Sequence, residues 1–175
     1  MSGPATSFMA WHYTSAEGFL DILRKRALVP APTTGGWNPR PLVWFSVNQD
    51  FEPSILLASA SAAAVEREGG IRSLRAAEGD VRIGVPVRTL LTCADVRRIS
   101  GMSQDTWAEL CERAREVGSD PDQWFASTRR IPLQECMIEV CERDGLWHRM
   151  QFRGDRSPAM NAPAPTRHRL ARTHA

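Results

Sequence analysis

Three short runs of this sequence carry side chains that can act on a small molecule. His12-Tyr13-Thr14 sets an imidazole, the only tyrosine of the chain and a hydroxyl side by side. Further along, Trp44-Phe45-Ser46 again combines aromatic and hydroxyl groups, and Gln134-Glu135 precedes the apolar run 137–141. Imidazole and hydroxyl groups hydrogen-bond a ligand, aromatic faces stack on flat rings, and a carboxylate stabilises a cationic transition state. The runs predict one site if the fold brings them together.

Motifs for other common chemistries are absent from the sequence. There is no Gly-x-Gly-x-x-Gly loop and no Gly-x-x-x-x-Gly-Lys-Ser/Thr loop, which disfavours the usual dinucleotide and phosphate sites. No histidine or cysteine pair has metal-ligand spacing, so no metal ligand is predicted. No Gly-x-Ser-x-Gly elbow marks a hydrolase nucleophile. Of the four histidines, His12 alone stands where a strand pattern meets a helix start.

The first run lies at a predicted strand-to-helix junction. Residues 8–13 have a strand pattern, and the next segment repeats apolar residues at helical spacing. These apolar residues are Ala16, Phe19, Leu20 and Leu23. They predict an amphipathic helix over 15–26. Thr14 and Glu17 have the spacing of a capping box, which predicts Thr14 as the N-cap.

The remaining patterns favour an α+β fold. Strand patterns cover 42–47, 81–87, 131–142 and 146–152, and helical patterns cover 55–66 and 104–117. Pro86 predicts an edge position for its strand, because proline donates no ladder hydrogen bond. Asp144-Gly145 predicts a tight hairpin. This order predicts helices packed on a mostly antiparallel sheet.

Composition predicts one globular domain with a flexible N-terminal segment and a disordered C-terminal tail. The 175 residues, 42% hydrophobic and 24% charged, suit a single α+β domain over 8–152. Residues 1–7 are predicted to be flexible. Residues 153–175 are predicted to form a disordered tail, rich in Pro, Ala and Arg and basic in charge. The rest of the chain is mildly acidic, which is unlike a folded nucleic-acid reader.

The cellular setting is predicted from what the sequence lacks. No apolar run is long enough to span a bilayer, and the N-terminus has no basic region followed by an apolar stretch. The four cysteines contain no Cys-x-x-Cys pair and are read as reduced thiols. These features predict a cytoplasmic protein without a membrane partner.

The three runs, in this order, resemble the ADP-ribosyltransferase-like superfamily in its histidine-containing branch. The resemblance covers roughly 8–152, and the spacing of Ile22-Leu23 to Ala27-Leu28-Val29-Pro30 is similar to small bacterial and toxin-like members. It implies a mostly antiparallel split sheet with packed helices. It also implies that NAD binds, as substrate, between the two halves of that sheet.

The resemblance further implies roles for five residues of the first two runs. His12 would hydrogen-bond the other ribose of NAD, the one that does not carry nicotinamide, and serve catalysis. The backbone of Tyr13, beside Thr14, would hold the nicotinamide amide. Trp44 and Ser46 would line the nicotinamide side. The implied activity is cleavage of the nicotinamide–ribose bond with transfer of ADP-ribose.

The implied catalytic carboxylate is Glu135, with Glu139 as the alternative. It would stabilise the cationic transition state. Protein-modifying members often carry an acidic residue or glutamine two positions earlier. Here Leu133 or Met137 stands there, and Gln134 is adjacent instead.

The acceptor and two rival functions stay open. A macromolecular acceptor is expected, with protein favoured over nucleic acid. One rival is a non-catalytic protein-binding or immunity-type module on the same scaffold, anchored by Trp37, Trp44 and Trp124. The other is an RNA-directed transferase that uses the arginine-rich tail.

Overall fold

The computed structural model describes residues 8–32, 40–57, 81–142 and 145–150. The strands are β1 (Met9–Thr14), β2 (Ala27–Leu28), β3 (Val43–Ser46), β4 (Val81–Pro86), β5 (Leu91–Thr92), β6 (Trp124–Ser127), β7 (Ile131–Pro132), β8 (Met137–Cys141) and β9 (Trp147–Arg149). The α-helices are α1 (Ala16–Lys25), α4 (Cys93–Ser100) and α5 (Gln104–Glu116). Short 3-10 turns are η1 (Pro53–Leu57), η2 (Val87–Thr89), η3 (Pro121–Gln123) and η4 (Leu133–Glu135). Together they form an α+β fold, as predicted.

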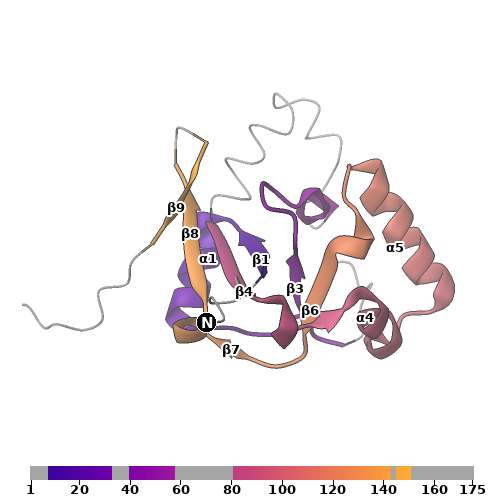
Figure 1. Ribbon diagram of the computed structural model, residues 1–175. Coiled ribbons are helices and arrows are strands. Elements are labelled where there is room, and N and C mark those ends of the chain that lie inside the picture. Colours follow the sequence, from indigo (N-terminus) through magenta and orange to yellow (C-terminus); the bar gives the residue numbers. More distant parts are fainter. Residues whose placement is uncertain (1–7, 33–39, 58–80, 143–144, 151–175) are drawn as a thin grey trace, which may run out of the picture.

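The main sheet consists of two antiparallel halves that meet at one point. Its seven strands run in the order β5-β6-β3-β1-β4-β8-β9, and β2 and β7 form a separate two-stranded sheet. β1 pairs with β4 along its whole length, whereas its described pairing with β3 consists of Trp11 opposite Ser46. Figure 1 shows β1, β4, β8 and β9 on one side and β3, β6, α4 and α5 on the other.

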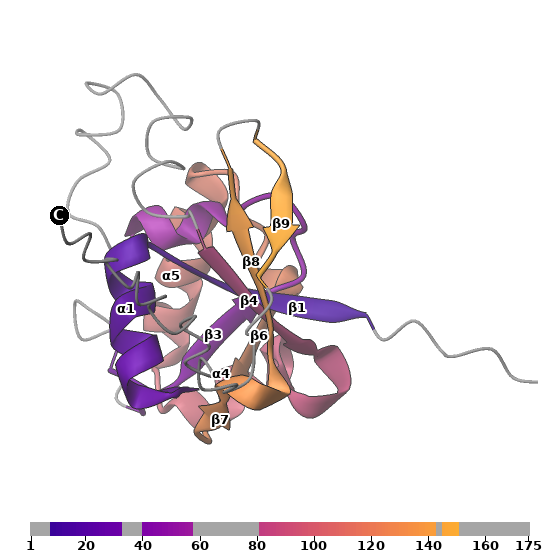
Figure 2. The ribbon, with the colours of Figure 1, turned by 90° about the vertical axis from the view of Figure 1, so that its left-hand side faces the viewer.

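Two hydrophobic clusters form the core of the fold. The first cluster contains Ala10, Phe19, Leu28, Val43, Phe45, Val81, Ile83, Val85, Ile131 and Ile138. It lies between α1 and the face of the sheet that α1 covers, which Figure 2 shows from the side. The second cluster joins α4 and α5 to β6 and contains Leu42, Val96, Trp107, Cys111 and Ala126. Phe45 of β3 belongs to the first cluster while Trp44 packs against the second, so β3 is the element that connects them.

The helix α1 begins one residue later than the capping-box pattern predicted. Ser15 is the N-cap, and its hydroxyl accepts a hydrogen bond from Gly18 N at 3.2 Å. Thr14 is instead the last residue of β1, and the prediction of Thr14 as the cap is wrong. Two successive hydroxyl residues satisfy the same local rule, and the extended ladder to β4 decides between them. At the other end Arg26 adopts φ 53° and turns the chain into β2.

The strand β4 lies in the middle of the sheet, which corrects the predicted edge position. It pairs with β1 on one side and β8 on the other. Pro86 is its last residue and lies beyond the pairing with β8, which ends at Gly84, so the missing proline amide interrupts no pairing on that side. On the other side, Val87 N donates to Phe8 O at 2.9 Å. Gly84 allows close approach of a ring, since a Cβ there would lie 2.6 Å from Cζ3 of Trp11.

Other predictions hold in part. The helix over 104–117 is confirmed as α5, and β8 and β9 pair as the predicted hairpin. The strand predicted over 131–142 is divided into β7, η4 and β8. Of the helix predicted over 55–66, the described part belongs to the 3-10 turn η1, and 58–66 lie outside the described residues.

Three predictions concern residues that the structure does not describe: the flexible segment 1–7, Trp37, and the tail 153–175. Within the described ranges, no helix has the length and apolar character to cross a membrane.

Candidate functional site

The site begins where β1 and β3 separate. If the register of Trp11 opposite Ser46 continued, Tyr13 would lie opposite Trp44. Instead, Nδ1 of His12 lies 2.9 Å from the carbonyl oxygen of Trp44. A carbonyl oxygen only accepts, so Nδ1 carries the proton and the imidazole supplies the hydrogen bond that a ladder amide would otherwise give. His12 therefore links the two strands beyond the point where their main-chain pairing ends.

This contact fixes the chemistry of the imidazole. Burial lowers the pKa of His12 below its ordinary value of 6.5, and the hydrogen bond to Trp44 opposes that shift only in part. The ring is therefore neutral at physiological pH. With the proton on Nδ1, the second nitrogen Nε2 is a hydrogen-bond acceptor.

A cavity of about 520 Å³ opens at the divergence of the strands. This volume is within the roughly 300–1,000 Å³ of small-molecule sites. Its lining combines the end of β1, the inner face of α1, β2, β3, the segment after β3, and parts of α5 and β6. His12, Tyr13, Thr14, Trp44 and Ser46, which the sequence analysis proposed as ligand-binding residues, all line it.

Trp44 brings an unused donor to this lining. Its indole nitrogen is buried and has no hydrogen-bond partner among the described residues. Its ring meets that of Trp124 edge to face, with centroids 5.8 Å apart. An unsatisfied buried N–H costs about 1–3 kcal/mol, so an acceptor on a ligand in the cavity would relieve that cost.

The side chain of Tyr13 is held by contacts within the protein. The hydroxyl donates to the carbonyl oxygen of Asn48 at 2.5 Å, and the ring packs edge to face against Phe51 and Trp147. Burial raises the pKa of this phenol to about 12, although Arg82 nearby acts in the opposite direction. The side chain therefore anchors the segment after β3.

Neither carboxylate proposed from the sequence lines the cavity. Glu135 is exposed in η4, the turn that connects β7 to β8, and it is not part of the cavity lining. Glu139 points to Arg82 of the neighbouring strand and forms an ion pair of 2.5 Å with it. The placement of both residues argues against a role in this cavity.

Within the described part of the chain, the buried carboxylate of the lining is Glu52, which the sequence patterns did not single out. Its side chain is 5% exposed. Its Oε1 accepts hydrogen bonds from Ser54 N at 3.1 Å, from Trp124 Nε1 at 3.3 Å and from the hydroxyl of Ser119. Its position shortly after Trp44-Phe45-Ser46 was the available signal, but the sequence of 48–53 has only the pattern of a turn, which by itself indicates no site.

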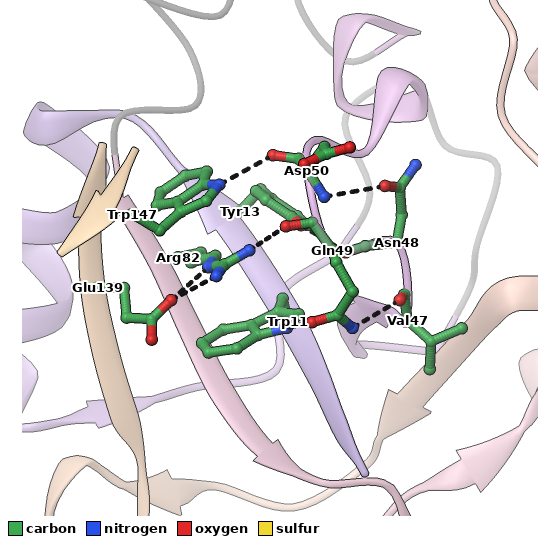
Figure 3. A network of polar contacts seen from close by, with 9 residues as sticks. All are labelled: Trp11, Tyr13, Val47, Asn48, Gln49, Asp50, Arg82, Glu139 and Trp147. Atoms are coloured by element: carbon green, nitrogen blue, oxygen red, sulfur yellow. Dashed lines mark hydrogen bonds and ion pairs between the residues drawn. The ribbon is translucent and has the colours of Figure 1, made fainter. Parts of the chain in front are cut away.

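A buried guanidinium holds the segment that carries Glu52. The cation of Arg82 lies between two indole rings, 4.1 Å from the centroid of Trp11 and 4.4 Å from that of Trp147. Its Nε lies 2.7 Å from Oε2 of Glu139, and its Nη1 donates to the carbonyl oxygen of Gln49 (Figure 3). Ion pair, cation–π contacts and main-chain bond thus converge on one side chain.

The two indoles fix the same segment directly. Trp11 Nε1 donates to the side-chain oxygen of Gln49 at 3.0 Å, and Trp147 Nε1 donates to the carbonyl oxygen of Asp50 at 3.2 Å. Figure 3 shows Trp11, Arg82 and Trp147, from β1, β4 and β9, pointing toward the segment after β3. The β1 half of the sheet thereby positions a segment that belongs to the β3 half.

Comparison with known proteins adds no further identification. No protein-family model matches the chain, and neither a curated protein nor a solved structure does. In the part of the chain that the structure describes, no group of three or more His, Cys, Asp or Glu residues is placed to hold a metal ion. The function is therefore argued from the geometry of the cavity.

Replacing Arg82 with glutamine should lower the free energy of unfolding by about 3 kcal/mol, since it leaves Glu139 without its cation in a site where Arg82 is 9% exposed. The matched control is Arg98→Gln, which removes an ion pair from an arginine that is 74% exposed and should leave the free energy of unfolding nearly unchanged. Urea denaturation of both variants measures the difference. Equal losses would contradict the role given to Arg82.

The lowered pKa of His12 predicts a pH dependence of stability. Unfolded His12 titrates near 6.5, so between that value and its lower folded pKa the unfolded chain binds more protons. The stabilisation is complete above 6.5 and is lost as the pH falls toward the folded pKa, with a slope of at most about 1.4 kcal/mol per pH unit. Denaturation at several pH values should show this slope in the wild type and a smaller one in His12→Gln. Identical slopes would exclude His12 as its source.

Proposed function

We propose that the protein is an NAD-dependent enzyme of the ADP-ribosyltransferase type, which cleaves the bond between nicotinamide and ribose. The observation that carries this proposal is the cavity at the divergence of β1 and β3. It gathers His12, Tyr13, Thr14, Trp44 and Ser46, the five residues that the resemblance implies for NAD binding, from two distant segments.

The architecture supports the proposal. The resemblance implies NAD between two antiparallel half-sheets, and here β1-β4-β8-β9 and β5-β6-β3 meet at one registered pair. A ligand bound where the two half-sheets meet contacts both of them. Binding would then draw on two separately packed cores.

The chemistry of the lining suits nicotinamide riboside. The neutral His12 offers Nε2 to a ribose hydroxyl, and Trp44 offers an aromatic surface and a buried indole N–H to an oxygen of the ligand. Arg113 of α5 also lines the cavity and supplies positive charge for the diphosphate.

The reaction breaks the bond between C1′ of the ribose and the nicotinamide nitrogen. The electron pair of that bond goes to the nicotinamide ring, which leaves as a neutral molecule, and the ribose becomes an oxocarbenium-like cation. A nucleophile of the acceptor attacks C1′ and loses its proton to solvent. The acceptor that we propose is a protein side chain, since the chain outside its arginine-rich end is mildly acidic and disfavours a polyanion.

A non-catalytic binding module is the second candidate. It is favoured by one observation, that Glu135 and Glu139 both lie outside the cavity lining. On this alternative the cavity and its tryptophans bind a ligand or partner without bond cleavage.

Release of labelled nicotinamide from NAD tests the proposal. The wild type should release nicotinamide above the uncatalysed rate, and His12→Ala should lower this rate about 100-fold, because it removes a hydrogen-bonding group that orients NAD in the cavity. The control is His148→Ala, which changes an exposed histidine of β9 outside the lining.

Each outcome discriminates between the two candidates. NAD binding without nicotinamide release would support the binding module. Absence of both binding and release, with a folded protein, would refute the NAD-dependent function.

A further inference from the structure

Among the residues that the structure describes, two carboxylates line the cavity, and they differ sharply in environment. Asp21 of α1 has a side chain that is 53% exposed and forms an ion pair of 2.5 Å with Lys25. Glu52 is 5% exposed, and none of its described hydrogen bonds comes from a lysine or arginine. A negative charge acts most strongly on a cationic centre where water is excluded and no counter-charge is bound. Glu52 therefore has the stronger field in the cavity.

The hydrogen bonds of Glu52 leave one carboxylate oxygen for a ligand. The main-chain N–H of Ser54, the hydroxyl of Ser119 and the indole N–H of Trp124 all bond to Oε1. Among the described residues, no hydrogen bond ends on Oε2. A carboxylate fixed through one oxygen keeps its orientation while the other oxygen accepts from a bound molecule.

Both halves of the sheet position this carboxylate. Trp124 begins β6 and Ser119 follows α5, where its own amide donates to Ala114 O at 2.9 Å, so these donors belong to the β3 half. The segment that leads to Glu52 is held from the β1 half, where Arg82 donates to Gln49 O. Glu52 is therefore tied to the same two bodies that border the cavity.

A chain of contacts connects Glu52 with the histidine. Glu52 bonds to the indole of Trp124, the ring of Trp124 meets the ring of Trp44, and the carbonyl of Trp44 bonds to His12. Carboxylate and imidazole thus both line the cavity and are linked through Trp44 and Trp124.

We propose that Glu52 is the catalytic carboxylate of this site and that it replaces Glu135 and Glu139 in that role. The proposal rests on the NAD-dependent function given above. Glu52 forms no covalent bond with the ribose. Its Oε2 accepts from the 2′-hydroxyl of the ribose, and its charge stabilises C1′ as the electron pair departs with nicotinamide. With water as acceptor, the products are nicotinamide, ADP-ribose and one proton.

Three glutamate-to-glutamine variants, assayed for nicotinamide release and NAD affinity, test the assignment. Glu52→Gln preserves an oxygen for the three donors but removes the charge. It should lower the rate of release at least 100-fold while the Kd for NAD changes less than about 5-fold. Glu109→Gln is the matched control on the exposed surface of α5 and should leave the rate within about 2-fold. Glu135→Gln is the rival, and it should also leave the rate nearly unchanged.

Chemical rescue separates a catalytic from a structural role. Formate should raise the rate of nicotinamide release by Glu52→Ala at least 10-fold above the rate of this variant without formate. The small carboxylate enters the space that the side chain vacated. A structural role predicts no rescue, and a variant that unfolds would show none. The thermal midpoint of each variant, measured with and without formate, identifies a general stabilising effect of the anion.

The outcomes distinguish this inference from the proposed function. If the wild type cleaves NAD and Glu52→Gln matches it, or if Glu135→Gln abolishes cleavage instead, the assignment of Glu52 is overturned and the NAD-dependent function stands. If Glu52→Ala loses activity without rescue, Glu52 is structural. If the wild type neither binds nor cleaves NAD, both proposals fail.

Discussion

The early separation of β1 from β3 is the constraint on which the rest of the site depends. After the pair Trp11–Ser46 the main-chain ladder stops, and a strand carbonyl loses its usual donor. A buried carbonyl without a partner is costly, so a side chain must supply the bond. His12 does so through Nδ1, and the same contact sets its tautomer and leaves its other nitrogen as an acceptor. One hydrogen bond thus bridges the strands where the ladder ends and sets the tautomer of the imidazole.

A split sheet needs a connection that keeps its halves in register. That connection is the segment after β3, which Arg82 and the indoles of Trp11 and Trp147 hold from the β1 half. A buried cation has a large desolvation cost, which the carboxylate of Glu139 and the two aromatic faces offset. The geometry of these contacts admits few alternative positions for the segment. The arrangement explains why an arginine and a glutamate lie on neighbouring strands with little exposure.

Local patterns in the sequence predicted the elements that depend on local rules. The strand before His12, the amphipathic helix α1 and the helix α5 follow from residue spacing. The choice between two adjacent hydroxyl residues as N-cap did not, because the pairing of Thr14 with Val81 decides it. The helix α4 and the strand β6 were missed, since each is short and is stabilised by contacts with distant residues.

The carboxylate of the site was beyond local inference for the same reason. Glu135 sits beside a strand in sequence, but the turn η4 directs it to solvent. Glu52 lies in a segment that reads as a turn, and its environment is created by Ser119 and Trp124, far along the chain. Residue type and order therefore predicted the histidine and aromatic side of the cavity, while the acidic side required the tertiary structure.

The most direct test of this account is a crystal structure of the protein with an NAD analogue whose ribose ring oxygen is replaced by carbon, so that the bond to nicotinamide resists cleavage. The account predicts the nicotinamide riboside in the cavity between β1 and β3, with a ribose hydroxyl at Nε2 of His12 and the indole of Trp44 against the ligand. An analogue bound elsewhere on the protein, or a cavity that stays empty at saturating analogue, would contradict it.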